Sequence, residues 1–319
     1  MTIYDCFNGD ADGICALTQL RLHDPQDSQL ITGVKRDISL LDRVQVEAGD
    51  LVNVLDVSLD KNRVPLTRIL AEGAQVFYCD HHFSGDIPEH ANLNVIINTT
   101  PNVCTSLLIN KELQGQFLEW AIVGVFGDNL TDVAIAMAKP LSLKAAQLDQ
   151  LKKLGVYLNY NGYGATIDDL HFDPAVLFQR ASKFATASDF LKDDRFTYQA
   201  LEDGYHEDMR SASAEKPVFE RSHVAVFELP EKAWARRVVG VFSNELANTD
   251  TARAHAVLTA RSDGDYAVSV RAPLENKRGA DEICRQFPTG GGRAAAAGIN
   301  QLPSEMKAEF IQAFSEFYS

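Results

Sequence analysis

Residues 3–13 read IYDCFNGDADG and contain the first unit of a pattern that the first half of the chain repeats. The letters IYDCF form an apolar run typical of a buried strand, and NGDADG is typical of a glycine-containing turn. Residues 13–23, GICALTQLRLH, carry apolar side chains at helical spacing. A strand, a tight turn and a helix in immediate succession indicate an α/β protein.

Strand-like and helix-like segments alternate up to about residue 130. Further strands are expected at residues 29–36, 51–58, 74–80 and 93–98, and further helices at 37–48, 62–73, 103–113 and 117–129. Parallel strands need long crossover connections, which are usually helices. The alternation therefore predicts a doubly wound, mainly parallel sheet.

The second half of the chain changes character. Residues 141–215 are helical and more polar, as expected of helices that bridge two lobes. Beyond them we expect strands at 223–229, a hairpin over 254–273 with DGD at its turn, and helices at 233–248, 280–287 and from Ser304. These changes predict an N-terminal domain over residues 1–180, a helical linker over 181–216 and a smaller C-terminal α/β domain over 217–319.

Composition excludes several classes of protein. The 319 residues carry a formal net charge of -14, which disfavours binding to long DNA or RNA, because such proteins usually need a basic surface. No apolar run approaches the length of a membrane span, and the N-terminal residues do not resemble a signal peptide. The cysteines form no CxxC pair and no zinc-finger spacing, so we expect reduced thiols and a cytoplasmic protein.

Acidic residues follow the first expected strand. Asp10 and Asp12 come directly after it, and ligands collect at the carboxyl ends of strands in open α/β sheets. Two carboxylates one residue apart can bind one hard cation or two neighbouring ones. The alternative is an aspartate-rich turn that only caps the next helix.

Two further strands end in the same kind of residue. Asp56 ends one apolar run, and Asp80, His81 and His82 end another. Imidazoles and carboxylates together suit divalent metals such as manganese, and Asp80 could orient one imidazole. A helix cap or buried salt bridge is the alternative for Asp56, and a surface histidine pair is the alternative for His81 and His82.

Asp128 follows an apolar helix that is expected to end at Gly127. A negative charge is unfavourable at a helix C-terminus, which indicates a compensating cation nearby. A plain helix-terminal turn is the alternative. Because each of these acids ends a buried segment, we expect them to meet on one rim of the sheet.

In combination the motifs resemble those of a known family. NGDADG (8–13), VLDVS (54–58), CDHH (79–82) and VGVFGDN (123–129) resemble, in this order, the four motifs of the DHH phosphoesterase superfamily. PTGGGRAAAAG (288–298) resembles the glycine loop of the first type of DHH-associated C-terminal domain. The resemblance implies a catalytic N-terminal DHH domain and a substrate-binding C-terminal domain.

The resemblance also implies a set of roles. Two Mn²⁺ or Mg²⁺ ions are expected, with Asp10 binding one, Asp12 the other, Asp56 bridging both, and His81 and Asp128 completing the second site. Two such ions would activate water for attack on a phosphate and neutralise the phosphoryl oxygens. Asp56, His81 and His82 are the candidate catalytic residues, with His82 contacting the substrate phosphate or holding the cluster. The candidate substrate-binding residues in the C-terminal domain are Arg271, Gly290, Gly291, Gly292 and Arg293.

The chain departs from the family pattern at three positions. Many relatives have a histidine where this chain has Cys6, and the exonuclease branch has an acid where it has Asn8. The first metal would therefore lack a protein ligand or use Asn8, Cys6 or a water. Arg293 stands where relatives usually have histidine, and it cannot carry protons near neutral pH.

The leading functional expectation is hydrolysis of very short oligonucleotides, dinucleotides above all, to mononucleotides by an Mn²⁺-dependent phosphodiesterase. Phosphatase action on 3′-phosphoadenosine phosphate or on linear or cyclic dinucleotide signals is an alternative. A nucleotide-binding regulator with a weakened metal site is another. A homodimer is compatible with the sequence, whereas long nucleic acid and membranes are not expected partners.

Overall fold

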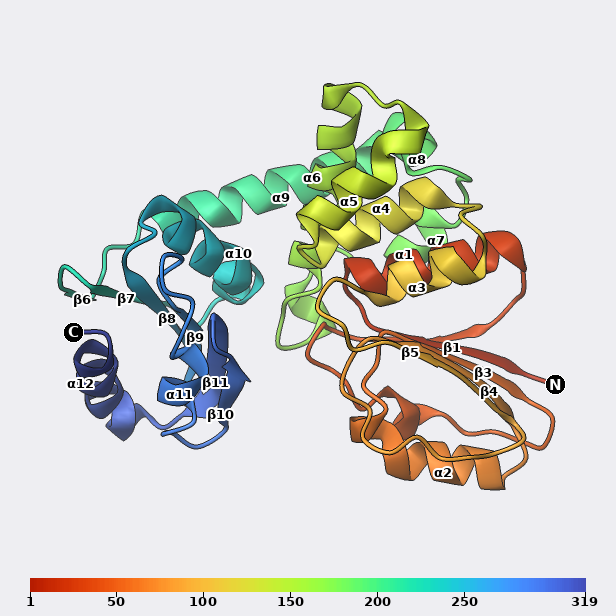
Figure 1. The fold of residues 1–319 in the computed structure, drawn as a ribbon, viewed down its shortest axis with the longest axis horizontal. Coiled ribbons are helices and arrows are strands. Elements are labelled where there is room, and N and C mark those ends of the chain that lie inside the picture. Colours follow the sequence, from red (N-terminus) through yellow and green to blue (C-terminus); the bar gives the residue numbers. More distant parts are fainter. The chain divides into compact units, whose positions relative to one another are not determined.

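The computed structural model describes residues 1–319, which form two compact units, Met1–Glu202 and Asp203–Ser319 (Figure 1). The boundary lies inside helix α9 (Arg195–Ser213). Both units combine helices with a sheet, as predicted. No helix has both the length and the apolar composition needed to cross a bilayer.

The first unit contains a five-stranded sheet in the order β2-β1-β3-β4-β5, and every pair of neighbouring strands is parallel. This confirms the predicted parallel sheet. The strands are β1 (Ile3–Phe7), β2 (Gln29–Ile31), β3 (Leu51–Leu55), β4 (Gln75–Asp80) and β5 (Leu93–Ile97). The carboxyl ends of β1, β3 and β4 are direct neighbours, so residues that follow these strands lie along one edge.

Helices cover both faces of this sheet (Figure 1). Helices α1 (Ala11–His23) and α3 (Thr105–Glu112) lie on one face, and α2 (Arg63–Ala71) lies on the other. Side chains of the sheet, including Val54 and Tyr78, pack with Leu66 and Ile69 of α2 in one buried cluster. The remaining helices of this unit are α4 (Leu118–Gly127), α5 (Thr131–Ala138), α6 (Ala145–Asn161), α7 (Pro174–Ala181) and α8 (Ala187–Asp193). Short 3₁₀ turns lie at Leu40–Arg43, Asp60–Asn62, Lys139–Leu141 and Ile167–Asp169.

One predicted helix is wrong. Residues 37–48 form only a 3₁₀ turn at Leu40–Arg43. The side chain of Asn62 accepts a hydrogen bond from the backbone N–H of Leu41 at 3.2 Å and donates one to the carbonyl of Ile38 at 2.6 Å. A side chain distant in sequence thus takes the backbone partners that a longer helix would have used.

The second unit contains a six-stranded mixed sheet in the order β10-β11-β9-β8-β7-β6. Its elements are β6 (Phe219–Glu220), β7 (Val224–Leu229), α10 (Ala233–Thr249), β8 (Ala254–Ala260), β9 (Tyr266–Arg271), α11 (Ala280–Cys284), β10 (Gly290–Arg293), β11 (Ala296–Leu302), a 3₁₀ turn at Ser304–Met306 and α12 (Lys307–Phe317). The expected hairpin is confirmed, because β8 and β9 pair in antiparallel fashion. Val268 and Val270 pack with α11 and α12, whereas Ser269 between them contacts Ser243 of α10, so helices cover both faces.

The glycine-rich segment is more ordered than the predicted loop. Gly290–Arg293 forms an edge strand that pairs with β11, and Gly291 lies opposite Gly298. A Cβ at Gly290 would lie 1.7 Å from the carbonyl oxygen of Cys284, and Gly292 has a φ of 138°. A Cβ at Gly291 would meet no heavy atom within 4 Å. Only the middle glycine therefore leaves open space beside the backbone.

Glycines also allow helices to pack closely beside the acids that are predicted to bind metal. A Cβ at Gly127 of α4 would lie 2.2 Å from the Cβ of Ala11 in α1 and 3.0 Å from the carbonyl oxygen of Gly155 in α6. Ala11 lies between Asp10 and Asp12, and Gly127 precedes Asp128. The contact thus fixes the distance between these acids.

We expect Gly127→Ala to move α4 away from α1, because packed helices cannot absorb an added methyl group at that distance. Overpacking costs about 1–3 kcal/mol, which exceeds the roughly 1 kcal/mol that alanine gains over glycine in a helix. Thermal unfolding in chelator and titration with Mn²⁺ should show a lower midpoint and weaker binding. Gly291→Ala is the control, and equal values for the two variants would contradict this account.

Candidate metal centre

Three neighbouring strands deliver the predicted acids and histidines to one edge of the sheet. Asp10 follows β1 and is the N-cap of α1, Asp56 follows β3, and Asp80 ends β4. His81 and His82 come directly after Asp80. The expected convergence of these residues is therefore present in the structure.

Asp10 and Asp12 are both buried and both hydrogen-bonded to backbone amides. One carboxylate oxygen of Asp10 accepts from the amides of Asp12 at 3.0 Å and Gly13 at 3.1 Å, so Asp10 also caps its helix. The Asp12 carboxylate accepts from the amides of Thr105 at 2.8 Å and Ser106 at 2.7 Å. These amides form the N-terminus of α3, where a negative charge is favoured.

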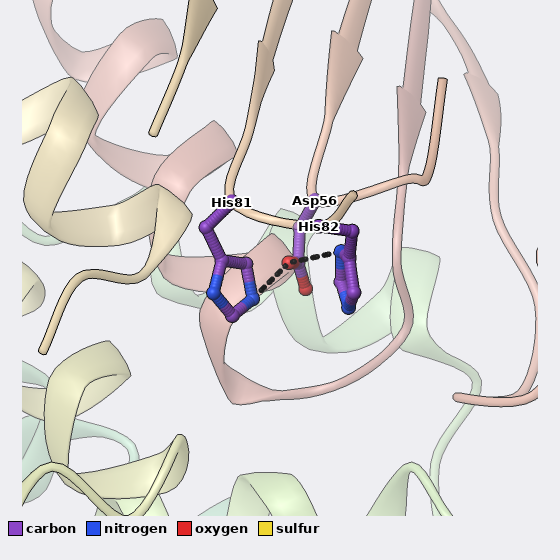
Figure 2. Close-up of side chains that lie close together, drawn as sticks. All are labelled: Asp56, His81 and His82. Carbon is purple, nitrogen blue, oxygen red and sulfur yellow. Dashed lines mark ion pairs between the residues drawn. The ribbon is translucent and has the colours of Figure 1, made fainter. Parts of the chain in front are cut away.

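Asp56 lies between the two histidine rings (Figure 2). Its Oδ1 is 3.4 Å from Nε2 of His81 and accepts a hydrogen bond from the Thr105 hydroxyl at 3.2 Å. Nδ1 of His81 is 3.0 Å from the carbonyl oxygen of Val103, which can only accept. Nδ1 therefore carries a proton, and the lone pair of neutral His81 is on Nε2, which lies 3.9 Å from Asp12.

His82 forms a pair with Asp80, as the sequence suggested for one of the two imidazoles. Its Nδ1 donates to the fully buried Asp80 at 2.8 Å and is 3.9 Å from Asp56. Burial lowers the pKa of His82, but the hydrogen bond to Asp80 and the charge of Asp56 outweigh it and raise the pKa to about 9. The raised pKa favours the cationic form of His82, whose side chain is 46% exposed.

Asp128 is the C-cap of α4, after the predicted helix end at Gly127. Burial and the carboxylate of Asp12 raise its pKa to about 6, although Lys35 and His81 act in the opposite direction. Burial, Asp12 and Asp10 also raise the pKa of Asp56 well above its ordinary value. The acids therefore repel one another, and a cation would relieve this repulsion.

The donor set suits a divalent metal ion. Ligand atoms of Asp56, His81 and His82 all lie within 4.8 Å of one another. Carboxylate and imidazole ligands together are compatible with Mn²⁺, and the tautomer of His81 presents the correct nitrogen. Asp56, His81 and His82 are thus close enough together to hold such an ion, and Asp12 lies 3.9 Å from Nε2 of His81.

The fold resembles that of several solved enzymes. A crystal structure of the exonuclease RecJ bound to manganese matches with a TM-score of 0.56 and 20% identity, over 99% of this chain and 90% of that chain. RecJ from Thermus thermophilus in complex with Mn²⁺ matches with a TM-score of 0.58 and 17% identity, over 99% of this chain and 52% of that chain. The pGpG-specific phosphodiesterase PggH from Vibrio cholerae matches with a TM-score of 0.53 and 13% identity, over 98% of each chain.

The chain therefore shares its two-domain α/β fold with the RecJ and PggH structures. No protein-family profile and no curated protein matches the sequence itself. A fold shared at so low an identity does not by itself assign an activity or a substrate.

Lys35 is the main residue beside these acids that the sequence alone did not reveal. Its Nζ is 2.5 Å from Oδ2 of Asp10 and 2.8 Å from Oδ1 of Asn159, and it lies 5.4 Å from the centre of the Tyr163 ring. Burial lowers the pKa of Lys35, but Asp10, Tyr163 and Asp128 raise it by more. Lys35 follows β2, the strand beside β1, and this position is the signal that could have identified it.

Two of the three residues that depart from the family motifs, Cys6 and Asn8, lie near the expected first metal position. Cys6 is fully buried and belongs to the apolar cluster that α2 covers. Burial raises the pKa of its thiol, so the thiolate form is strongly disfavoured. Asn8 donates to the carbonyl oxygen of Lys35 at 3.3 Å, and its own side-chain oxygen is buried without a hydrogen-bond partner.

Aromatic side chains near the expected site divide into two groups. Tyr157 and Tyr160 are buried and pack in the core of the first unit. Phe83, next to His82, is 74% exposed. It offers an apolar face to solvent within one residue of the histidine pair.

The candidate substrate residues lie in the second unit. Arg271 ends β9, where its guanidinium donates to Asn244 at 2.7 Å and to Ser269 at 3.0 Å. Arg293 ends the edge strand β10 and is exposed. Their roles toward a substrate stay predictions.

We expect Asp128→Asn to stabilise the metal-free protein and to weaken its binding of Mn²⁺. The raised pKa of Asp128 means that its ionisation destabilises the fold, and this cost appears as the pH rises through about 6. At pH 7.5 the variant should gain at most about 3 kcal/mol, and below pH 4 the gain should vanish. Unfolding midpoints in chelator and in Mn²⁺ test this, and a variant destabilised without metal at pH 7.5 would refute it.

Proposed function

We propose that the protein is a metal-dependent phosphodiesterase that cleaves very short oligonucleotides, dinucleotides preferentially, into mononucleotides. The observation that carries the proposal is the position of the Asp56 carboxylate between His81 and His82 and beside Asp12 (Figure 2). Mn²⁺ is the proposed ion, because manganese is the ion named for both similar RecJ structures.

Each residue of the centre has a proposed role in catalysis. A divalent ion bound there would acidify a water and neutralise phosphoryl oxygens. Asp12, Asp56, His81 and Asp128 would hold the ion, and Thr105 orients Asp56 through its hydroxyl. His82, fixed by Asp80 through Nδ1, would donate its Nε2–H to a phosphate oxygen.

Three observations favour a short substrate. The net charge of -14 disfavours a long polyanion. PggH, whose name specifies the dinucleotide pGpG, matches over 98% of both chains. The exposed ring of Phe83 beside His82 could stack on a base, as aromatic residues do in proteins that bind single strands.

The second unit would contribute phosphate contacts of its own. Arg271 and Arg293 carry guanidinium groups that suit phosphate, and the open space beside Gly291 would let a phosphate approach the backbone. Gly290 and Gly292 support the strand that presents Gly291.

We expect kcat/KM to be at least about tenfold higher for dinucleotides than for decanucleotides, since a longer polyanion adds repulsion from the acidic surface without adding contacts. The measurement is a panel of RNA and DNA substrates from two to ten nucleotides with Mn²⁺. Comparable kcat/KM values across the panel would exclude the length preference.

Asp56→Asn is the matched inactive variant for this panel. Asp56 has a φ of 61°, a conformation that asparagine also tolerates, and an amide oxygen can still accept from Thr105. The fold should therefore persist while turnover is abolished, because a neutral amide binds cations poorly. Near-normal rates for this variant in saturating Mn²⁺ would show that the site lies elsewhere.

For the second unit we expect Arg293→Ala to raise KM for a dinucleotide by roughly tenfold to a hundredfold, because a lost charged hydrogen bond costs about 1.5–3 kcal/mol. Bound Mn²⁺ should be unchanged. Arg285→Ala, which removes a surface arginine paired with Asp281, is the control and should leave KM unaltered. Equal KM values for both variants would remove Arg293 from the substrate site.

A further inference from the structure

The side chain of Lys35 contacts the acid that was predicted to bind the first of two metal ions. Its ammonium group is 2.5 Å from Oδ2 of Asp10, while Oδ1 of Asp10 accepts from two amides of α1. Asn159 accepts a second hydrogen bond from Lys35 at 2.8 Å. Asp10 differs from Asp12, whose partners are neutral backbone amides, because an ammonium group of the same protein neutralises its charge.

The rest of the first metal position lacks anionic ligands. Cys6 lies fully buried in the apolar cluster that α2 covers, and Asn8 is neutral. A metal at this position would share Asp10 with an ammonium group at hydrogen-bonding distance. Two cations competing for one carboxylate repel each other strongly in a buried site.

The second metal position has carboxylates and an imidazole close together. Nε2 of His81 lies 3.4 Å from Asp56 and 3.9 Å from Asp12, and Asp128 follows Gly127, which packs against Ala11 beside Asp12. These residues supply three carboxylates and a correctly protonated imidazole. A single divalent ion would satisfy them.

We propose that the centre binds one divalent ion, held by Asp12, Asp56, His81 and Asp128, and that the ammonium group of Lys35 takes the place of a second ion beside Asp10. This replaces the two-ion prediction, and it rests on the proposed function only in treating the site as a metal centre. Lys35 has three N–H groups, of which two donate to Asp10 and Asn159. The third would donate to a phosphoryl oxygen of the substrate.

The number of bound ions tests this proposal without any substrate. Chelator-treated protein is titrated with Mn²⁺, and bound metal is measured by elemental analysis and by electron paramagnetic resonance. Wild-type protein should bind one ion per chain and give the spectrum of an isolated Mn²⁺. Two ions per chain with an exchange-coupled spectrum would overturn the proposal.

Variants of both partners sharpen the result. Lys35→Ala frees Asp10 and should allow a second ion, whereas the control Lys153→Ala, at a surface lysine paired with Asp149, should bind one. A folded Lys35→Ala protein that still binds only one ion would contradict the proposal that the Lys35 ammonium group occupies the place of a second ion. Asp10→Asn should bind one ion within about threefold of wild-type affinity, and loss of that ion would overturn the proposed ligand set.

Failure of this proposal and failure of the proposed function are distinguishable. Protein that binds one isolated ion but cleaves no dinucleotide would keep the lysine assignment and reject the phosphodiesterase. Protein that cleaves dinucleotides with two coupled ions would keep the phosphodiesterase and reject the lysine assignment.

Discussion

The hydrogen bonds between Asp12 and the first amides of α3 join the elements of the candidate metal centre. They place a buried carboxylate of α1 at the positive end of another helix, which offsets part of the cost of burying the charge. The same turn supplies Thr105, whose hydroxyl holds Asp56, and Val103, whose carbonyl fixes the tautomer of His81. A shift of α3 would thus disturb three candidate ligands together. The close contact of Gly127 with Ala11 adds Asp128 to the same assembly.

The spacing of apolar residues predicted most strands and helices of the parallel sheet. The apolar runs ending at Asp56 and Asp80 form parallel strands, and the apolar helix before Asp128 ends at Gly127 as expected. The helix expected over residues 37–48 does not form, because Asn62, distant in sequence, binds its backbone. The glycine segment reads as a loop in the sequence, because its pairing with β11 has no local signal.

The candidate site shows the same limit. Acids and histidines at strand ends are recognisable in the sequence, because a charge that ends a buried run needs a partner. Lys35 stands near the end of the strand expected at residues 29–36, but nothing in that segment identifies Asp10 as its partner. Its importance depends on β2 lying beside β1, which is a property of the strand order rather than of the neighbouring residues. Contacts of this kind are the ones that decide how many cations a cluster of acids can accept.

The left-handed backbone of Asp56 has a consequence for how such a protein could change over evolutionary time. At a φ of 61° most side chains are strained, while aspartate, asparagine and glycine are tolerated. Aspartate codons differ by one base from those of asparagine and of glycine, so the replacements that this backbone accepts most easily all remove the charge. A single base change would therefore leave the folded scaffold in place and take a negative charge out of the acidic cluster.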